Sequence, residues 1–318
     1  MTQACAFWMV ARGVGELRHE TLPPPGADEV LVRMLASGIS RGTEAIVFAG
    51  RVPPSQHDAM RAPLMTGRFP FPVKYGYAAV GLTPTGARVF VLHPHQDLFV
   101  APRAMCVAVP DGVPTQRAVL AANMETALNI VWDARPLAGE RMLVVGAGVV
   151  GLLTAALLAR IPAARVTIVD PDLGRAAHAA RFGCMFAHPD DGPDEQELIV
   201  HASGTEAGLH LALDRAAFEA RIVEASWFAD RMPALPLGEA FHSRRLRITA
   251  SQVGSVARPM RGRRTHAQRL EIALALLEDA AFDTLLEPQT EFADLPREMP
   301  RLLQGGLCHV VRYAGARA

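Results

Sequence analysis

The pattern of hydrophobic and polar positions is most regular between residues 142 and 170. A strand-like apolar run opens this stretch and is followed by three closely spaced glycines, Gly146, Gly148 and Gly151. A helix-like apolar segment comes next, and a second run rich in β-branched residues ends on Asp170. This change of period predicts a strand, a glycine-rich turn, a helix and a second strand.

The three glycines fit a turn that binds a dinucleotide. Gly146 permits a tight turn, Gly148 lets the backbone approach a pyrophosphate, and Gly151 lets the helix pack close to the sheet. The first residues of the helix, Val149 and Val150, present unpaired N–H groups and a partial positive charge to the phosphates. We therefore predict a dinucleotide site at the start of this helix.

The acidic residue that ends the second strand predicts which dinucleotide binds. Asp170 lies 22 residues after Gly148, where a carboxylate can accept hydrogen bonds from a ribose diol and would repel a 2′-phosphate. We expect NAD, with NADP less favoured, and we expect Arg175 to reach the same ribose. Ala202 and Ser203 follow a later strand, and we expect their backbone to pass the nicotinamide ribose.

Two other interpretations of this stretch stay open at the level of sequence. Residues 142–159 are apolar and long enough to span a membrane, although three glycines within six residues fit a change from strand to helix better. The same strand, turn, helix and acidic residue also occur in methyltransferases that bind S-adenosylmethionine.

The first third of the chain has a different pattern from the middle. Short apolar runs there are separated by proline and glycine, as at Glu29–Met34, Ala87–Leu92 and Leu98–Ala101. A helix is predicted at Ala118–Trp132, after which strands and helices alternate, and this alternation implies a parallel sheet with crossover helices. The expected elements are 142–146, 149–160, 165–169, 173–182, 197–201, 206–215, 221–225 and 245–250.

The last part of the chain returns to a mixed pattern. It has one clear predicted helix, Thr265–Ala280, and one predicted strand, Cys308–Tyr313, which can rejoin the first domain. We therefore predict a β-rich domain built from residues 1–120 and 256–318. A nucleotide-binding domain, residues 121–255, is inserted between its two parts.

Composition narrows the classes of partner. Of the 318 residues, half are hydrophobic, and 32 Lys and Arg balance 32 Asp and Glu, so we expect neither a nucleic acid nor a membrane surface as partner. The four cysteines are far apart and form no CxxC pair, which argues against a disulfide framework or a zinc ribbon. No signal-peptide pattern is seen at the start, and we expect a cytoplasmic protein.

Three further motifs carry a resemblance to a known family. They are residues 36–44 (ASGISRGTE), 71–81 (FPVKYGYAAVG) and 109–114 (VPDGVP). Together with the glycine turn and Asp170, they resemble the medium-chain dehydrogenase/reductase superfamily, to which the zinc-type alcohol dehydrogenases belong. Residues 39–44 are similar to the branch that includes bacteriochlorophyllide a dehydrogenase, although the following residues differ enough that its substrate is not transferred.

The resemblance implies a fold and an activity. The fold would be α/β, with a Rossmann doubly wound parallel sheet inserted into a β-rich, GroES-like catalytic domain. The activity would be that of an NAD(P)-dependent dehydrogenase or reductase acting on a small molecule. Dimers are usual in this superfamily, so a homodimer is expected, with residues 246–251 as the sheet edge at its interface.

This chain departs from the zinc-type pattern at the metal ligands. Ser40 stands where zinc-type members have a cysteine ligand, Tyr77 stands where they have a histidine ligand, and the four-cysteine lobe for structural zinc is absent. A zinc ion needs three or four converging Cys, His or carboxylate ligands. We therefore predict no zinc and no other metal. His95 is a modest candidate for lining the substrate pocket.

Protein side chains must then supply the acid–base chemistry. The matching position makes Tyr77 the first choice, and Lys74 could supply a cation that lowers its pKa. The alternative is that Tyr77 is an aromatic packing residue that fills the space of the metal and its ligand. Ser40, Thr43 and Glu44 lie on the loop where zinc enzymes keep a ligand and a proton-relay hydroxyl. Glu44 is either a general base with a pKa raised by burial or a first-turn acid of a helix.

The sequence thus predicts a zinc-independent, NAD-dependent oxidoreductase. It would interconvert an alcohol and a ketone, or reduce an activated double bond, on a small organic substrate. The competing class is a non-catalytic NAD(H)-binding redox sensor or partner subunit. A methyltransferase that uses S-adenosylmethionine is the third interpretation.

Overall fold

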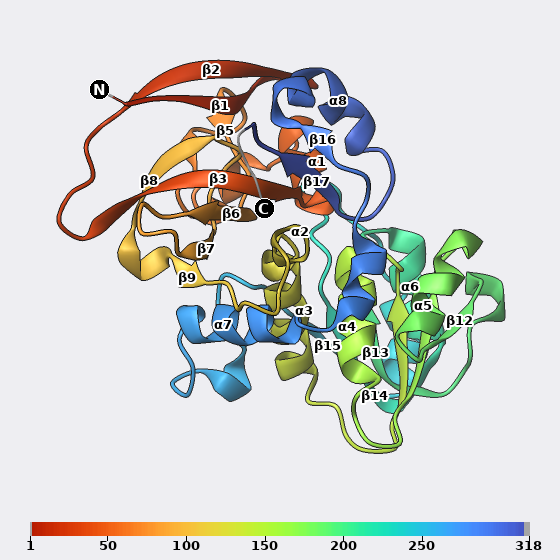
Figure 1. Ribbon diagram of the computed structural model, residues 1–318. Coiled ribbons are helices and arrows are strands. Elements are labelled where there is room, and N and C mark those ends of the chain that lie inside the picture. Colours follow the sequence, from red (N-terminus) through yellow and green to blue (C-terminus); the bar gives the residue numbers. More distant parts are fainter. Residues whose placement is uncertain (1, 315–318) are drawn as a thin grey trace. The chain divides into compact units, whose positions relative to one another are not determined.

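The computed structural model describes residues 2–314, and the chain folds into two compact units (Figure 1). One unit is built from the residues up to Ala122 together with those from Leu270 onward, and the other is Asn123–Arg269. The predicted fold class, a parallel sheet inserted into a β-rich domain, is confirmed.

The first unit contains two sheets. One has the strand order β2 (Val14–Leu22), β1 (Thr2–Ala11), β5 (Val73–Lys74), β4 (Thr66–Gly67). The other has the order β16 (Thr290–Glu291), β17 (His309–Arg312), β3 (Glu29–Ile39), β6 (Ala79–Leu82), β7 (Arg88–Val91), β9 (Val107–Ala108), with β8 (Leu98–Pro102) also paired to β3. Its helices are α1 (Arg41–Phe48), α2 (Thr115–Ala118) and α8 (Leu295–Leu302).

A strand from the C-terminal part of the chain, β17, belongs to the same sheet as β3 from the N-terminal part. Strand β17 pairs antiparallel with β3, with His309 opposite Ile39 and Arg312 opposite Ala36. The predicted return of the last strand to the first domain is therefore confirmed. This pairing encloses a core in which Phe7, Phe90 and Phe99 are buried.

The second unit contains a six-stranded sheet in which every ladder is parallel. The order is β12 (Met185–Ala187), β11 (Arg165–Val169), β10 (Arg141–Val145), β13 (Gln196–His201), β14 (Ala216–Glu224), β15 (Arg247–Ala250). The crossover helices are α4 (Val149–Leu158), α5 (Ala176–Arg181) and α6 (Glu206–Asp214). This is the doubly wound order in which a ligand binds beyond the carboxyl ends of the central strands.

The predicted elements of this unit are present, and the prediction lacked one strand. The short strand β12, only three residues long, was not expected from its pattern. Strand β15 lies at the sheet edge, as predicted for residues 246–251. Whether that edge forms a dimer interface stays a prediction.

The long apolar stretch 142–159 is not one helix. Its first residues form β10, and the later ones form the ten-residue helix α4, which is apolar on all sides because nearly every residue is buried in the unit. Across residues 2–314, none of the helices combines the length and the hydropathy needed to cross a membrane. The interpretation of this stretch as a membrane span was wrong.

The second unit extends further along the chain than the predicted boundary at residue 255. Helix α3 (Ala121–Ala134) begins near its start, and α7 (His266–Leu276) crosses its end. The buried guanidinium of Arg269 hydrogen-bonds Glu125 and Asn129, and the N–H of Ala257 donates to Asn129 Oδ1. These contacts hold residues 256–269 in the second unit, and they could not be predicted from the local sequence pattern.

Candidate functional site

The three glycines of the turn between β10 and α4 have different structural roles. Gly146 has φ +107°, and a Cβ there would lie 2.7 Å from Ser203 N. A Cβ on Gly151 would lie 1.9 Å from Gly146 O, so the helix could not start in this position with a side chain there. Gly148 has no atom within 4 Å of its hypothetical Cβ, which leaves open space beside the backbone.

The start of α4 presents N–H groups. The first intrahelical hydrogen bond runs from Leu152 N to Gly148 O at 2.9 Å, so the N–H groups of Val149 and Val150 lie at the open end of the helix. Such an end carries a partial positive charge and suits a phosphate. That Val149 and Val150 bind the pyrophosphate stays a prediction.

Asp170 is tied to this turn through both carboxylate oxygens. Its Oδ2 accepts a hydrogen bond from Ala147 N at 2.7 Å, and its Oδ1 accepts one from Asp172 N at 2.9 Å. Arg175 pairs with Asp172, with 3.0 Å between Nε and Oδ2. The predicted contact of Arg175 with the ribose stays a prediction.

A pocket of about 510 Å³ opens beside Asp170 at the carboxyl ends of β10 and β11. Val169, Pro171 and Leu211 form apolar parts of its wall, while Asp170, Ser203 and Thr205 add polar groups. Sites for small ligands are usually pockets lined mainly by apolar side chains with a few polar groups.

Arg215 also lines this pocket, and its Nε is an unsatisfied donor. Among the described residues, only Arg215 Nε and Thr154 Oγ1 are buried side-chain polar atoms without a hydrogen-bond partner. Buried donors are normally paired, and the rest of the Arg215 guanidinium is: Nη1 donates to Asp194 Oδ1 at 2.7 Å and Nη2 to Asp190 O at 3.4 Å.

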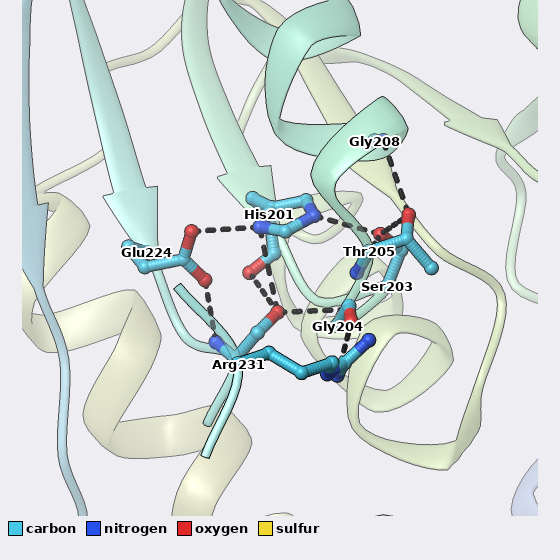
Figure 2. Close-up of polar contacts among 8 residues, drawn as sticks. His201, Ser203, Gly204, Thr205, Gly208, Glu224 and Arg231 are labelled. Carbon is cyan, nitrogen blue, oxygen red and sulfur yellow. Dashed lines mark hydrogen bonds and ion pairs between the residues drawn. The ribbon is translucent and has the colours of Figure 1, made fainter. Parts of the chain in front are cut away.

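The backbone N–H of Ala202 is engaged within the sheet. Its N–H donates to Val145 O at 2.8 Å and so continues the sheet ladder. Ser203 contributes its side chain to the pocket, where its hydroxyl joins a hydrogen-bonded cluster (Figure 2). That this segment passes the nicotinamide ribose by its backbone stays a prediction.

The cluster in Figure 2 is a feature that sequence reasoning missed. His201 Nδ1 lies 2.7 Å from Glu224 Oε2, and His201 Nε2 lies 2.7 Å from Ser203 Oγ. His201 and Glu224 are opposite each other at the ends of β13 and β14. The signal was a histidine at the end of one predicted strand, 197–201, and a glutamate near the end of another, 221–225, but the register that pairs them comes only from the structure.

Further contacts fix the loop after β13. Ser226 Oγ accepts a hydrogen bond from Gly204 N at 3.0 Å, and Arg231 donates to Gly204 O at 2.7 Å. Thr205 caps helix α6 by accepting from Gly208 N at 3.1 Å. A Cβ on Gly208 would lie 2.3 Å from Ser203 Oγ, so the cluster requires glycine at this position.

Four of the predicted catalytic residues come together in the first unit. Glu44, in α1, is fully buried, and its Oε1 accepts a hydrogen bond from Ser40 N at 2.7 Å. Burial and then the Glu44 charge raise the pKa of Tyr77 to about 12. Hydrogen bonds with the side chains of Ser40 and Thr43 oppose that rise in the pKa of Tyr77. The phenol is therefore protonated at neutral pH.

Lys74 is not part of this group. Its ammonium donates to Glu20 Oε2 and to Gln96 Oε1, each at 2.7 Å, and lies 5.8 Å from the centre of the Trp8 ring. The predicted lowering of the Tyr77 pKa by Lys74 is wrong: the ammonium is engaged by other partners, and the pKa is raised.

A buried chain of polar side chains continues from Glu44. His95 Nε2 lies 3.0 Å from Glu44 Oε2, His95 Nδ1 lies 2.7 Å from Ser37 Oγ, and Ser37 Oγ lies 2.9 Å from the Tyr313 hydroxyl. His95 is buried rather than placed along an open pocket, so its predicted lining role is corrected. Tyr313 comes from the far end of the sequence, and only the pairing of β17 with β3 brings it here.

The donor set does not fit a zinc ion. A hydroxyl at Ser40 and a phenol with a pKa near 12 at Tyr77 are poor zinc ligands. Over residues 2–314, the structure brings no three His, Cys, Asp or Glu side chains into an arrangement that could hold a metal. The absence of zinc from the protein stays a prediction.

Comparison with solved structures identifies the fold. Benzyl alcohol dehydrogenase of Acinetobacter calcoaceticus is similar, with a TM-score of 0.79, 14% identity, and coverage of 99% of this chain and 100% of that one. An Escherichia coli alcohol dehydrogenase complexed with NADH has a TM-score of 0.78, 15% identity, and coverage of 98% and 100%. The chain has the fold of the medium-chain dehydrogenase/reductase superfamily. A Sinorhizobium meliloti dehydrogenase with this fold is bound to NADP, with a TM-score of 0.78, 16% identity, and coverage of 98% and 100%.

Curated relatives match shorter segments. D-xylulose reductase A of Aspergillus niger is 30% identical over 171 residues, which are 48% of this chain and 44% of that protein. L-threonine 3-dehydrogenase of Chelativorans sp. is 29% identical over 120 residues, 37% of this chain and 35% of that protein. The curated relatives first in similarity are matched over only about 37% of their own length. No protein-family model matches the chain.

Proposed function

We propose that this chain is an NAD-dependent oxidoreductase that interconverts an alcohol and a ketone on a small organic substrate without zinc. The observation that carries the proposal is the glycine turn at the start of α4 beside a pocket that Asp170 lines. Dehydrogenases that share the fold carry NADH or NADP, and the matching segments of curated relatives come from a reductase and a dehydrogenase.

The residues present fit a dinucleotide. The open space at Gly148 and the N–H groups of Val149 and Val150 would hold the pyrophosphate. Asp170, which lines the pocket, would accept hydrogen bonds from the adenosine ribose. When bound, the nicotinamide supplies or accepts the hydride.

Asp170 favours NAD over NADP. A carboxylate accepts hydrogen bonds from a free 2′-hydroxyl and repels a 2′-phosphate. Asp172 adds a second carboxylate, and it pairs with the guanidinium of Arg175.

Tyr77 would act as the proton donor to a carbonyl oxygen. With a pKa near 12, the phenol keeps its proton at neutral pH, as a general acid must before it gives that proton up. Ser40 and Thr43 hydrogen-bond the phenol and would stabilise the phenolate that forms. Both oxygens of Glu44 are engaged within the protein, so we assign Glu44 a positioning role.

Zinc has no part in this proposal, because the side chains at the positions of Ser40 and Tyr77 do not suit it. The protein would instead stabilise the developing negative charge with hydroxyl donors. No observation favours a non-catalytic NAD(H) sensor or a methyltransferase over this function. The homodimer and the cytoplasmic location remain predictions.

Ligand binding and turnover together test the function. The protein is heated with NADH, NADPH or S-adenosylmethionine, since a ligand that binds only the folded state raises the melting temperature. NADH oxidation is then followed with a panel of ketones and activated alkenes. We expect the largest shift with NADH and ketone-dependent oxidation. Stabilisation by S-adenosylmethionine alone would contradict the proposal, and NADH binding without turnover on any substrate would favour a sensor.

A further inference from the structure

The hydrogen-bonded cluster at the ends of β13 and β14 forms a continuous chain of four side chains (Figure 2). Glu224 contacts His201, His201 contacts Ser203, and Ser203 Oγ lies 2.9 Å from Thr205 Oγ1. His201 is fully buried, and Thr205 at the other end is exposed and lines the pocket beside Asp170. The chain therefore connects a shielded carboxylate to the pocket.

The carboxylate sets the direction of the hydrogen bonds. An ionised Glu224 can only accept, so His201 Nδ1 must donate to it, and Nε2 of the neutral imidazole is then an acceptor. Ser203 consequently donates its hydroxyl proton to His201 Nε2. Ser203 Oγ in turn accepts from Thr205, both from the backbone N–H at 3.2 Å and from the hydroxyl at 2.9 Å.

Thr205 is left as an acceptor toward the pocket. Its hydroxyl proton is used by Ser203, and one lone pair accepts from Gly208 N. The remaining lone pair belongs to an exposed group in the same pocket as the Asp170 carboxylate. Asp170 and Thr205 thus both present hydrogen-bond acceptors, which suit a ligand that donates hydrogen bonds.

We propose that Glu224, acting through His201 and Ser203, fixes Thr205 as a hydrogen-bond acceptor and so selects a nucleotide with free ribose hydroxyls. The inference rests on the proposed function, because it needs a dinucleotide in this pocket. A ribose phosphate brings only acceptor oxygens, which would face lone pairs and remain unsatisfied. Glu224, His201 and Ser203 are positioning residues, and Thr205 is the group that meets the ligand.

The same residue types also occur in nucleophilic triads. In this chain, however, two donors from Thr205 engage the lone pairs of Ser203 Oγ, which an attacking oxygen would need. The contacts of Ser203 therefore favour a relay of hydrogen bonds over covalent chemistry.

Glu224→Gln tests the direction of the chain without changing its shape. In the wild type, Glu224 Oε1 accepts from Ser226 N at 2.7 Å. The glutamine carbonyl must take over that bond, so its NH₂ group faces His201 Nδ1 and donates to it. The imidazole proton then moves to Nε2, Ser203 accepts from it, and the hydroxyls of Ser203 and Thr205 become free to donate into the pocket.

The dissociation constants of NADH and NADPH are measured for each variant by titration. We expect Glu224→Gln to weaken NADH binding about fivefold and to strengthen NADPH binding. The dissociation constant of NADPH divided by that of NADH should therefore fall about tenfold. Ser203→Ala cuts the chain in a half-exposed loop and should lower the ratio in the same direction. The matched control is Glu219→Gln. Glu219 lies on β14 like Glu224 and forms an exposed ion pair with Arg245, so its substitution should leave the ratio unchanged.

The outcomes separate this inference from the proposed function. An equal loss of affinity for both nucleotides, or an unchanged ratio in Glu224→Gln and Ser203→Ala, would refute the relay, since a merely structural role weakens both ligands alike. A wild-type protein that binds neither nucleotide would refute the proposed function and the relay together.

Discussion

Replacing Arg269 by methionine removes the central cation of a buried cluster in the nucleotide-binding unit. The guanidinium is only 1% exposed. It donates to Glu125 Oε1 at 3.0 Å, to Asn129 Oδ1, to Val253 O at 2.6 Å and to Ser255 O at 3.2 Å. Methionine retains part of the buried hydrocarbon and none of these hydrogen bonds.

The expected loss of stability follows from what the substitution leaves behind. Breaking a buried ion pair by removing one partner costs about 3–5 kcal/mol, because the other charge stays buried and unpaired. The backbone carbonyls can recover water as the site relaxes, so we expect a total of about 4 kcal/mol. That is a large part of the roughly 5–15 kcal/mol that stabilises a typical domain, and it corresponds to a fall of about 10 °C in melting temperature.

The loss should also depend on pH in a definite direction. Burial raises the pKa of Glu125, and the nearby Arg269 opposes this. Without Arg269, the folded pKa of Glu125 rises further above its unfolded value, so the folded state binds the proton more tightly. Stability of the variant should therefore recover as the pH falls from 8 to 5.

Urea unfolding at pH 8 and at pH 5 measures both effects. The control is Arg141→Met in the same unit, since Arg141 is about half exposed and 3.5 Å from Glu197, and its loss should cost at most about 0.5 kcal/mol. A cost for Arg269→Met no greater than that of the control, or one that does not shrink at pH 5, would refute the reasoning.

Three further predictions concern the site. Tyr77→Phe should lower ketone reduction about 100-fold while the dissociation constant of NADH stays unchanged; an undiminished turnover number would exclude the donor role. Gly151→Ala puts a methyl group 1.9 Å from Gly146 O, so NADH titration and thermal unfolding should show loss of both binding and stability. Because the pKa of Tyr77 is about 12 in the folded protein, against an ordinary value near 10, the folded state keeps this proton between pH 10 and 12. The wild type should lose about 2 kcal/mol of stability across that interval, and Tyr77→Phe should lose correspondingly less in the same alkaline unfolding series.

The sequence predicted the nucleotide-binding unit well because its signals are local. A strand such as Arg165–Val169 is a run of β-branched residues, and the glycines at 146 and 151 are required by contacts within the same motif. The three-residue strand β12 is too short to carry a period, and the tie between Arg269 and Glu125 joins residues 144 positions apart. Neither feature can be predicted from the local sequence pattern.

The candidate catalytic group was predicted in part for a similar reason. Ser40, Thr43 and Glu44 lie on one short segment, and the family resemblance linked them to Tyr77. Lys74 was placed beside Tyr77 because the two are close in sequence. In the structure its ammonium instead contacts Glu20 and Gln96, which come from distant parts of the sequence.

The histidine networks were not predicted at all. The contacts of His95 with Ser37 and of Ser37 with Tyr313 depend on the long-range pairing of β17 with β3. Likewise, the contact of His201 with Glu224 depends on the register of two parallel strands, which local pattern does not fix.

In the proposed function, the nucleotide reacts in a site built from protein side chains alone. Transition-metal content and ketone-dependent NADH oxidation should be measured on the same purified sample, before and after dialysis against a chelator. We expect turnover with far less than one metal ion per chain and no change on chelation. A stoichiometric metal ion whose removal abolishes turnover, and whose return restores it, would contradict the account.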